Sequence, residues 1–172
     1  TVTVGRASTN QIVIKDERCS RYHAEIFLTR AGADPARLWL EVTERVLLED
    51  SGQTRRSLDA LGGLGIRLAV DDFGVGYSSL GYLHRFPLHA IKIDRSFVGP
   101  LGTDQRADAV VQAMLHMAAA LSLHVVAEGV EHESQMARLL DLDEGRLGRA
   151  LFCQGFLLGR PQDAENIHLS AM

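Results

Sequence analysis

The hydrophobic pattern of the chain changes near residue 30. Before it, three short alternating runs predict strands at 1–4, 11–14 and 23–28, separated by polar turns. After it, apolar runs of strand length alternate with segments whose apolar residues recur every three to four positions. This second pattern predicts strands at 37–44, 66–72, 89–94, 124–128 and 151–158. Between them it predicts helices at 51–64, 78–86, from a cap at Thr103 or Asp104 to about 121, and 133–142. Strands alternating with helices favour a parallel sheet with right-handed crossovers.

The helical spacing also predicts which side chains face the core. Leu58 and Leu61 are expected to face inward, and Leu80 and Leu83 are the apolar positions of the helix 78–86. In the helix that ends at about 121, one apolar face is formed by the residues that recur at helical spacing: Ala107, Val110, Val111, Met114, Ala118 and Leu121.

Length and composition narrow the class of protein. The 172 residues are 46% hydrophobic and 23% charged, as in globular proteins, but a complete eight-stranded α/β barrel needs about 250. A formal net charge of −4 gives no bulk basic field for duplex nucleic acid or an anionic membrane. No apolar run approaches the roughly 18 residues of a membrane span, and no signal-peptide pattern is present. Cys19 and Cys153 form neither a disulfide framework nor a metal spacing, so we expect a cytoplasmic protein.

Two adjacent carboxylates, Asp71 and Asp72, end the predicted strand 66–72 and precede a glycine-punctuated loop. Neighbouring acids repel each other unless a cation lies beside them. A helix N-cap acid with a solvated neighbour has the same spacing, so the pair alone leaves both interpretations open.

Further chemistry-bearing residues lie near the carboxyl ends of other predicted strands. Glu41, Asp71 and Glu128 occupy the rim where α/β barrels place their sites. Lys92 stands between two isoleucines on a strand, faces opposite to them, and needs an anionic partner. Oxygen ligands without clustered His or Cys select Mg²⁺ or Mn²⁺ over zinc.

Five motifs stand in a fixed order along the chain. They are Leu-Glu-Val-Thr-Glu at 40–44, Asp-Asp-Phe-Gly-Val-Gly-Tyr-Ser-Ser-Leu at 71–80, Ile-Lys-Ile-Asp-Arg-Ser-Phe-Val at 91–98, Val-Ala-Glu-Gly-Val-Glu at 126–131, and Gln-Gly-Phe at 154–156 with Gly-Arg-Pro at 159–161. In this order they resemble the EAL domain of cyclic-di-GMP phosphodiesterases, over about residues 30–165. The resemblance implies a partial TIM-type (β/α) barrel with about five parallel strands, and an ancestral metal-dependent hydrolysis of cyclic-di-GMP.

The resemblance also implies roles for single residues. Metal ligands would be Glu41, Asp71 and Glu128, with Asp72 binding a second ion. Lys92 would orient or deprotonate the attacking water, Glu44 would anchor the loop after Asp72, and Gln154 would complete the water or metal shell. Two Mg²⁺ or Mn²⁺ ions could then activate water and stabilise charge on a phosphodiester.

Several features of the family are missing or altered. The strands that carry the family's signature Glu, a metal-binding Asn and a substrate-gripping Arg have no counterpart here. Val75 stands where the family usually has Thr, and a longer stretch at 141–152 puts the alignment of Gln154 in doubt. We therefore expect catalysis to be lost, because Mg²⁺ would lack much of its octahedron. The alternatives are a module that binds cyclic-di-GMP or a protein without hydrolysis, and a structural scaffold without native function.

Residues 1–29 carry a second resemblance, to the middle of a forkhead-associated (FHA) domain, which binds phosphothreonine peptides. It rests on Gly-Arg at 5–6, Asn-x-Ile-x-Ile at 10–14 and Ser-Arg-x-His-Ala at 20–24. It implies that Arg6, Ser20 and Arg21 face a phosphopeptide, as the guanidinium fork suits phosphate. Only about a third of such a domain is present, so no working phosphopeptide site is expected.

The two resemblances divide the chain at about residue 30, into an FHA-like fragment (1–29) and a truncated EAL-type barrel segment (30–172). We interpret the sum as a chimera, with a natural gene fusion or a truncated piece as the alternatives. Three strands and five strands make eight, so we expect the N-terminal strands to cover the open edge of the partial barrel. Exposed edges also predict a homodimer, with segment swapping as one route to it.

Overall fold

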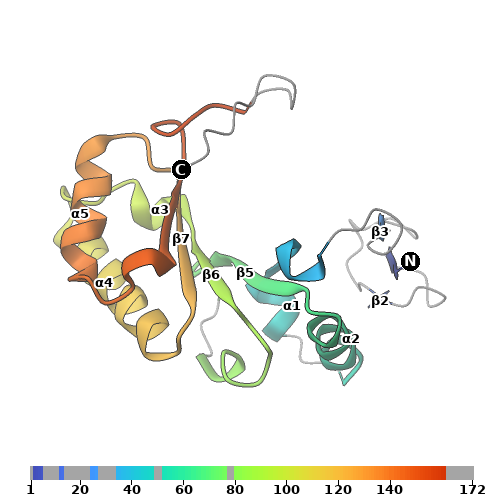
Figure 1. Cartoon of the computed structure of the whole chain (residues 1–172). Helices are drawn as coiled ribbons and strands as arrows, with labels where there is room; N and C mark the ends of the chain where they lie inside the picture. The colour runs from blue at the N-terminus through green and yellow to red at the C-terminus, as the bar shows by residue number, and fades with distance from the viewer. Residues whose placement is uncertain are drawn as a thin grey trace. The chain divides into compact units, whose positions relative to one another are not determined.

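The structure is a computed structural model that describes residues 2–5, 12–13, 24–26, 34–48, 52–76 and 80–161 (Figure 1). Its strands are β1 (Val2–Gly5), β2 (Ile12–Val13), β3 (Ala24–Ile26), β4 (Trp39–Thr43), β5 (Arg67–Phe73), β6 (Ala90–Ile93), β7 (His124–Glu128) and β8 (Leu151–Gln154). Its helices are α1 (Glu44–Leu48), α2 (Gly52–Gly63), α3 (Arg95–Val98), α4 (Gln105–Ala120) and α5 (Glu133–Asp143), with 3₁₀ turns η1 (Pro35–Arg37), η2 (Leu80–Tyr82) and η3 (Gly148–Ala150).

Five strands form one parallel sheet in the order β4-β5-β6-β7-β8, which is also their order in the chain. This confirms the predicted α/β class and the five parallel strands of a partial barrel. The central strands are the most apolar: all four residues of β6 are buried, as are three consecutive residues of β5. A strand covered on both faces must be apolar throughout, which explains why these segments stand out in the sequence.

The three N-terminal strands form a sheet of their own, in the order β2-β1-β3. Strand β1 pairs with β2 in parallel and with β3 antiparallel. The predicted strand positions are therefore confirmed, but these strands do not extend the parallel sheet by hydrogen bonding, as a cover for its edge would. The eight described strands therefore form two sheets and not one, because the main-chain partners of β1 lie within the N-terminal group. Arg6, Ser20 and Arg21 lie outside the described residues.

The chain divides into two compact units, residues 1–92 and 93–172. In the first unit α1 packs on β4 and β5, and α2 packs on β5. Leu58 and Leu61 of α2 are buried, as the helical spacing predicts. Strands β4 and β5 run in register from Trp39 opposite Arg67 to Thr43 opposite Asp71. This register places the carboxyl end of β4 beside Asp71 of β5.

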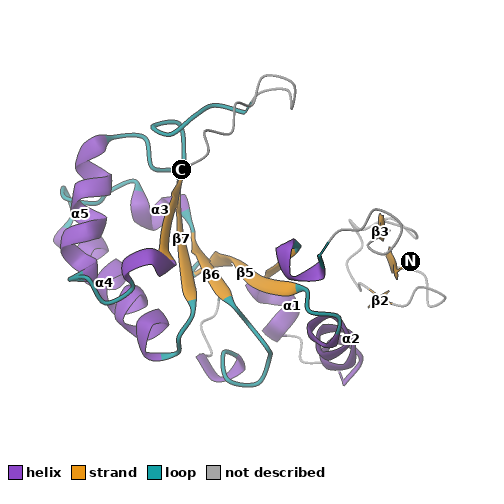
Figure 2. Ribbon diagram, viewed as in Figure 1, coloured by secondary structure: helices purple, strands orange, loops and turns teal. Residues whose placement is uncertain are grey.

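In the second unit α4 and α5 lie side by side, with α4 against β7 (Figure 2). Asp104 is the N-cap of α4, since its carboxylate accepts from the Arg106 amide at 2.8 Å, and this confirms the predicted start. The buried face of α4 is formed by Ala107, Val111, Leu115 and Ala118. The predictions for Val110 and Leu121 are wrong, since these are 40% and 43% exposed. The buried face of α4 includes Leu115, so Val110 and Leu121 lie outside it.

Short elements differ most from the prediction. Within the predicted helix 78–86, the described residues hold only the turn η2, because Gly81 and Pro87 leave too few residues for a stable helical nucleus. Helices α1 and α3 each follow a strand directly and are too short to show a period. Strand β8 ends at Gln154 rather than 158 because a turn begins at Gly155.

Candidate functional site

Asp71 and Asp72 lie near the carboxyl end of strand β5, which continues to Phe73, within the first unit. Asp71 is half-buried and Asp72 is exposed. Carboxylate oxygens of the two residues lie within 4.8 Å of one another. Asp72 also has a left-handed backbone, with φ at 53°, which Asp tolerates better than most residues do. The pair is close enough to share a cation, which is one of the two interpretations that the sequence leaves open.

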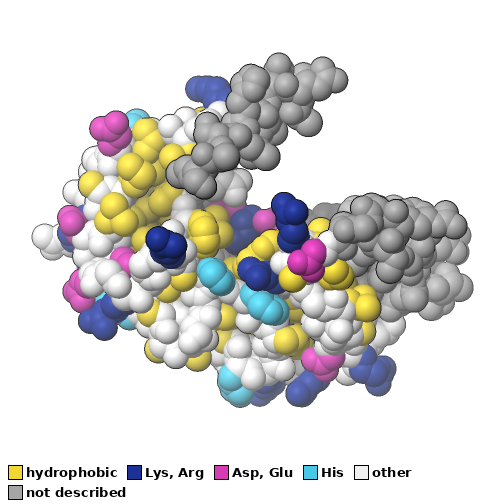
Figure 3. Space-filling view, in the orientation of Figure 1, with side chains coloured by type: hydrophobic (Ala, Val, Ile, Leu, Met, Phe, Trp, Pro, Cys, Tyr) yellow, Lys and Arg dark blue, Asp and Glu magenta, His cyan; other side chains and the backbone are white. Residues whose placement is uncertain are grey.

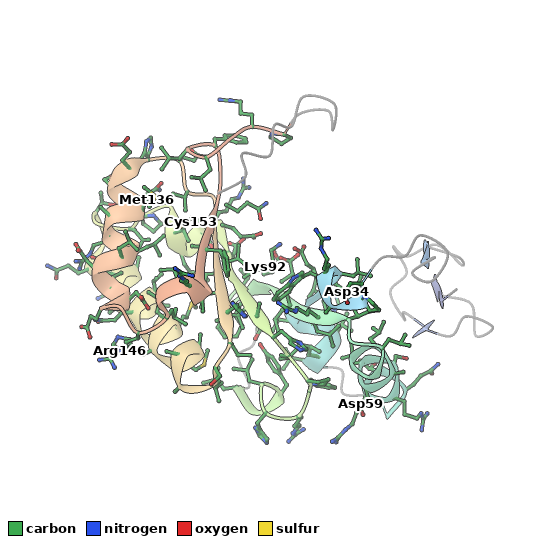
Figure 4. The ribbon with its side chains drawn as sticks, in the orientation of Figure 1. Asp34, Asp59, Lys92, Met136, Arg146 and Cys153 are labelled. Carbon is green, nitrogen blue, oxygen red and sulfur yellow. The ribbon has the colours of Figure 1, made fainter. Side chains whose placement is uncertain are left out.

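Lys92, labelled in Figure 4, lies on β6 and contacts two of the predicted acids. Its Nζ lies 2.9 Å from Oδ1 of Asp71 and 2.9 Å from Oε2 of Glu41, and the residue is only 6% exposed. Glu41 comes from β4, where it pairs with Ala69 of β5. A buried ammonium is unfavourable unless anions surround it, and two carboxylates provide the anionic partner that the sequence predicts.

Glu44 begins α1 directly after β4 and is 2% exposed. Its Oε2 accepts a hydrogen bond from the Gly74 amide at 3.2 Å, two residues after Asp72. A Cβ at Gly76 would lie 3.2 Å from the same oxygen, so only glycine fits there without displacement of the carboxylate. The contact agrees with loop anchoring, whereas a part for Glu44 in any reaction stays a prediction.

Sequence reasoning missed Tyr82, a buried residue of η2. Burial raises the pKa of Tyr82 above its ordinary value, and the nearby charge of Glu44 raises it further. A tyrosine in an apolar segment is typical of a protein core, so no spacing in the sequence singles it out.

In the second unit Glu128 ends β7 and is paired in register with Gln154 of β8. The Val130 amide donates to the Gln154 carbonyl at 3.1 Å, which fixes the backbone just beyond this pair. The longer stretch at 141–152 falls mainly in the end of α5, the following turn and η3. Gln154 lies opposite Glu128 in the sheet, and its part in the site stays a prediction.

These geometries can be compared with known proteins. The family model for the EAL domain matches residues 8–161. The chain belongs to the EAL family. Among curated relatives, this EAL chain is 42% identical to the bifunctional diguanylate cyclase/cyclic di-GMP phosphodiesterase MucR of Pseudomonas aeruginosa. The 140 aligned residues cover 81% of this chain and 20% of that protein. The chain is 46% identical over 134 residues to the cyclic di-GMP phosphodiesterase NbdA of the same organism, covering 78% and 16%.

Solved EAL structures give the same result for the fold. A complex of the PaMucR phosphodiesterase with c-di-GMP superposes with a TM-score of 0.71 at 42% identity, over 80% of this chain and 53% of that one. A manganese and cyclic-di-GMP complex of Klebsiella pneumoniae BlrP1 gives 0.69 at 36% identity, over 78% and 33%. This EAL chain thus spans about half of the PaMucR chain and a fifth or less of these curated relatives.

The EAL match begins at residue 8, inside the segment 1–29 that resembles an FHA domain. The comparisons add nothing to the FHA resemblance or to a chimeric origin, which stay predictions. No helix in the described part of the chain is long and apolar enough to cross a membrane. On the face shown in Figure 3, acidic and basic side chains of the described residues are interspersed, in keeping with the net charge of −4.

Proposed function

We propose that this EAL chain binds cyclic-di-GMP through Mg²⁺ or Mn²⁺ held by acids at the carboxyl end of its sheet, and that the 172-residue chain does not hydrolyse it. The observation that supports this most strongly is the contact of one buried ammonium, Lys92, with both Glu41 and Asp71. Such a group of opposite charges is the arrangement in which a divalent ion and a phosphodiester find partners.

The donor set fits a hard cation. Glu41, Asp71 and Asp72 offer carboxylate oxygens, and the latter two lie within 4.8 Å of each other. We include Glu128 because β7 belongs to the same parallel sheet, and the carboxyl ends of parallel strands meet at one edge. Mg²⁺ and Mn²⁺ prefer such oxygen ligands. When bound, a divalent cation would polarise a phosphodiester oxygen and offset its charge.

The remaining residues would act on substrate and water. Lys92 would orient a water or a phosphate oxygen, since it is held in place by two acids. Glu44 would keep the loop after Asp72 in position through Gly74. Gln154 would present its amide beside Glu128, its partner in register. These three roles follow the family resemblance and agree with the contacts of each residue.

Loss of hydrolysis is proposed because the metal shell is incomplete. An octahedral ion needs six oxygen ligands, and the family's signature Glu and Asn have no counterpart in this sequence. Lys92 also engages oxygens of Glu41 and Asp71. An incomplete set of metal ligands can still support ligand binding. It is a poorer basis for hydrolysis, which requires water and phosphate to be aligned.

Calorimetric titration with cyclic-di-GMP, with and without Mn²⁺, tests the proposal when combined with chromatography for the linear dinucleotide. We expect saturable heat that requires Mn²⁺, without turnover. Asp71→Asn should abolish the heat. The matched control is Asp59→Asn on α2, which makes the same charge change at an exposed site and should leave binding intact (Figure 4). Turnover would show an enzyme instead, and absence of heat would show a scaffold.

Assembly and location are part of the same proposal. The edge strands β4 and β8 of the parallel sheet support a homodimer, in which a second copy covers an edge, with segment swapping as one route. Light scattering that gives a monomer at every concentration would contradict it.

We also propose a cytoplasmic location and a division at about residue 30, with an FHA-like fragment before it. We expect that a phosphothreonine peptide binds neither the wild-type chain nor the Arg6→Ala variant.

A further inference from the structure

Two buried polar atoms stand out behind the loop that follows Asp72. Oε1 of Glu44 and the hydroxyl of Tyr82 are both buried, and neither has a hydrogen-bond partner among residues 34–48, 52–76 and 80–161. The residues are 2% and 4% exposed. Buried polar atoms without partners are rare in proteins, because each loses its bonds to water without replacement. The two atoms therefore call for a common explanation.

The chemistry of the two groups is complementary. An ionised carboxylate can only accept hydrogen bonds, whereas a phenol can donate one. Burial and the charge of Glu44 raise the pKa of Tyr82, so its hydroxyl keeps its proton at neutral pH. The Glu44 carboxylate lies near enough to act on the phenol, so an acceptor and a donor share one buried region.

The other oxygen of Glu44 connects this pair to the site. Oε2 accepts from Gly74, two residues beyond Asp72, and lies against Gly76. Whatever fixes the Glu44 carboxylate therefore also fixes the loop that carries Asp72. A rotated carboxylate would release the Gly74 amide and the backbone next to Asp72.

We propose that Tyr82 is a positioning residue for this loop: its hydroxyl donates to Oε1 of Glu44 and so orients Oε2 toward the Gly74 amide. The link to metal binding rests on the proposed function, since it assumes that Asp72 is a ligand. The link to the loop does not. A tyrosine that only fills the core would instead stabilise the whole unit and leave the loop no more protected than its surroundings.

Hydrogen exchange on the metal-free full chain tests the loop directly. Tyr82→Phe keeps the ring and removes the hydroxyl, and we expect the Gly74 amide to exchange about tenfold faster, while the amides of α4 and α5 are unchanged. The control is Phe86→Leu, which trims another buried ring in the same segment and removes no hydrogen bond. An unchanged Gly74 amide, or equal acceleration at all amides, would overturn the proposal.

A double variant tests whether Tyr82 acts through Glu44 and not through a local disturbance of the fold. Glu44→Gln keeps the shape of the side chain, and in its background Tyr82→Phe should accelerate Gly74 exchange much less than tenfold, because the two groups act as one unit. Fully additive effects would contradict the proposal.

Titration with Mn²⁺ then separates the two proposals. Tyr82→Phe should weaken Mn²⁺ binding about fivefold to tenfold without an equal shift in the urea midpoint, whereas Phe86→Leu should shift the midpoint and not the affinity. A wild-type chain that binds no Mn²⁺ would defeat the proposed metal site, and the Gly74 exchange rates would still decide the role of Tyr82.

Discussion

Lys92 and Asp71 are joined by a 2.9 Å contact between Nζ and Oδ1, and the same ammonium reaches Glu41 at 2.9 Å. Acids of the neighbouring strands β4 and β5 are thus held together by a cation that the chain itself supplies. A divalent ion at the proposed site would need the same oxygens, so Lys92 and the ion would compete for them or share them.

Replacing Lys92 tests this balance. Lys92→Met should lower the free energy of unfolding by about 1–2 kcal/mol, because Asp71 and Glu41 lose the cation between them. The expected loss of unfolding free energy is modest because both acids are partly exposed to water. Urea denaturation measures it, and Mn²⁺ should restore part of the loss by supplying the missing charge. A loss that Glu41→Gln does not reduce in the double variant would argue against this origin.

The left-handed backbone of Asp72 separates its structural and chemical roles. Asp72→Asn keeps a side chain that tolerates φ of 53°, so stability should stay within about 0.5 kcal/mol. Asp72→Ala should cost about 1 kcal/mol from backbone strain. Both changes remove the carboxylate charge, so both should weaken Mn²⁺ binding in a titration, Asp72→Ala more strongly because Asn keeps a carbonyl oxygen. Unchanged affinity in both variants would exclude Asp72 as a ligand.

The Asp108 carboxylate predicts a specific dependence on pH. The Gly102 amide donates to it at 2.9 Å and Arg138 of α5 at 2.9 Å, and these contacts, the Gly102 bond first, hold the pKa of Asp108 below its usual value. The folded state therefore binds the proton less readily than the unfolded state. Its stabilisation is complete above the unfolded pKa of about 4 and disappears as pH falls through the folded pKa.

Asp108→Asn should accordingly lower stability by about 1 kcal/mol at pH 7, and the difference from wild type should shrink below about pH 4. Thermal unfolding across pH measures this difference. Asp141→Asn, at an exposed position of α5, is the control and should show little effect at any pH. A difference that grows on acidification would contradict the assignment.

Gly155 controls the close approach of the two loops that follow β7 and β8. A Cβ there would overlap the backbone of Val130, whose amide donates to the Gln154 carbonyl at 3.1 Å. Gly155→Ala should cost about 2–3 kcal/mol in urea denaturation, because backbone cannot move aside as a side chain can. Gly159→Ala, with open space around the added methyl, should be nearly neutral. Equal effects would exclude a packing origin.

The strands could be predicted from the sequence because burial on both faces leaves an unmistakable apolar run. Strand β7 was located at its observed bounds, and Asp104 was identified as a cap by its chemistry. The need of Lys92 for acids follows equally from its place in a buried strand. Local patterns determine all three.

The contacts that depend on tertiary structure could not be predicted in this way. Glu44 and Tyr82 interact across a long interval of sequence, and neither shows a local signal for the other. Helices α1 and α3 owe their existence to the strands that precede them and not to their own period. The separate pairing of β1 with β2 and β3 likewise depends on which edges are within reach.

The ammonium of Lys92 offsets one of the two negative charges of Glu41 and Asp71, which lowers their mutual repulsion before any ion binds. Under the proposed function, folding and ion loading are then separate events. A shortage of manganese or magnesium would lower the proposed nucleotide binding more than it lowers the amount of folded chain.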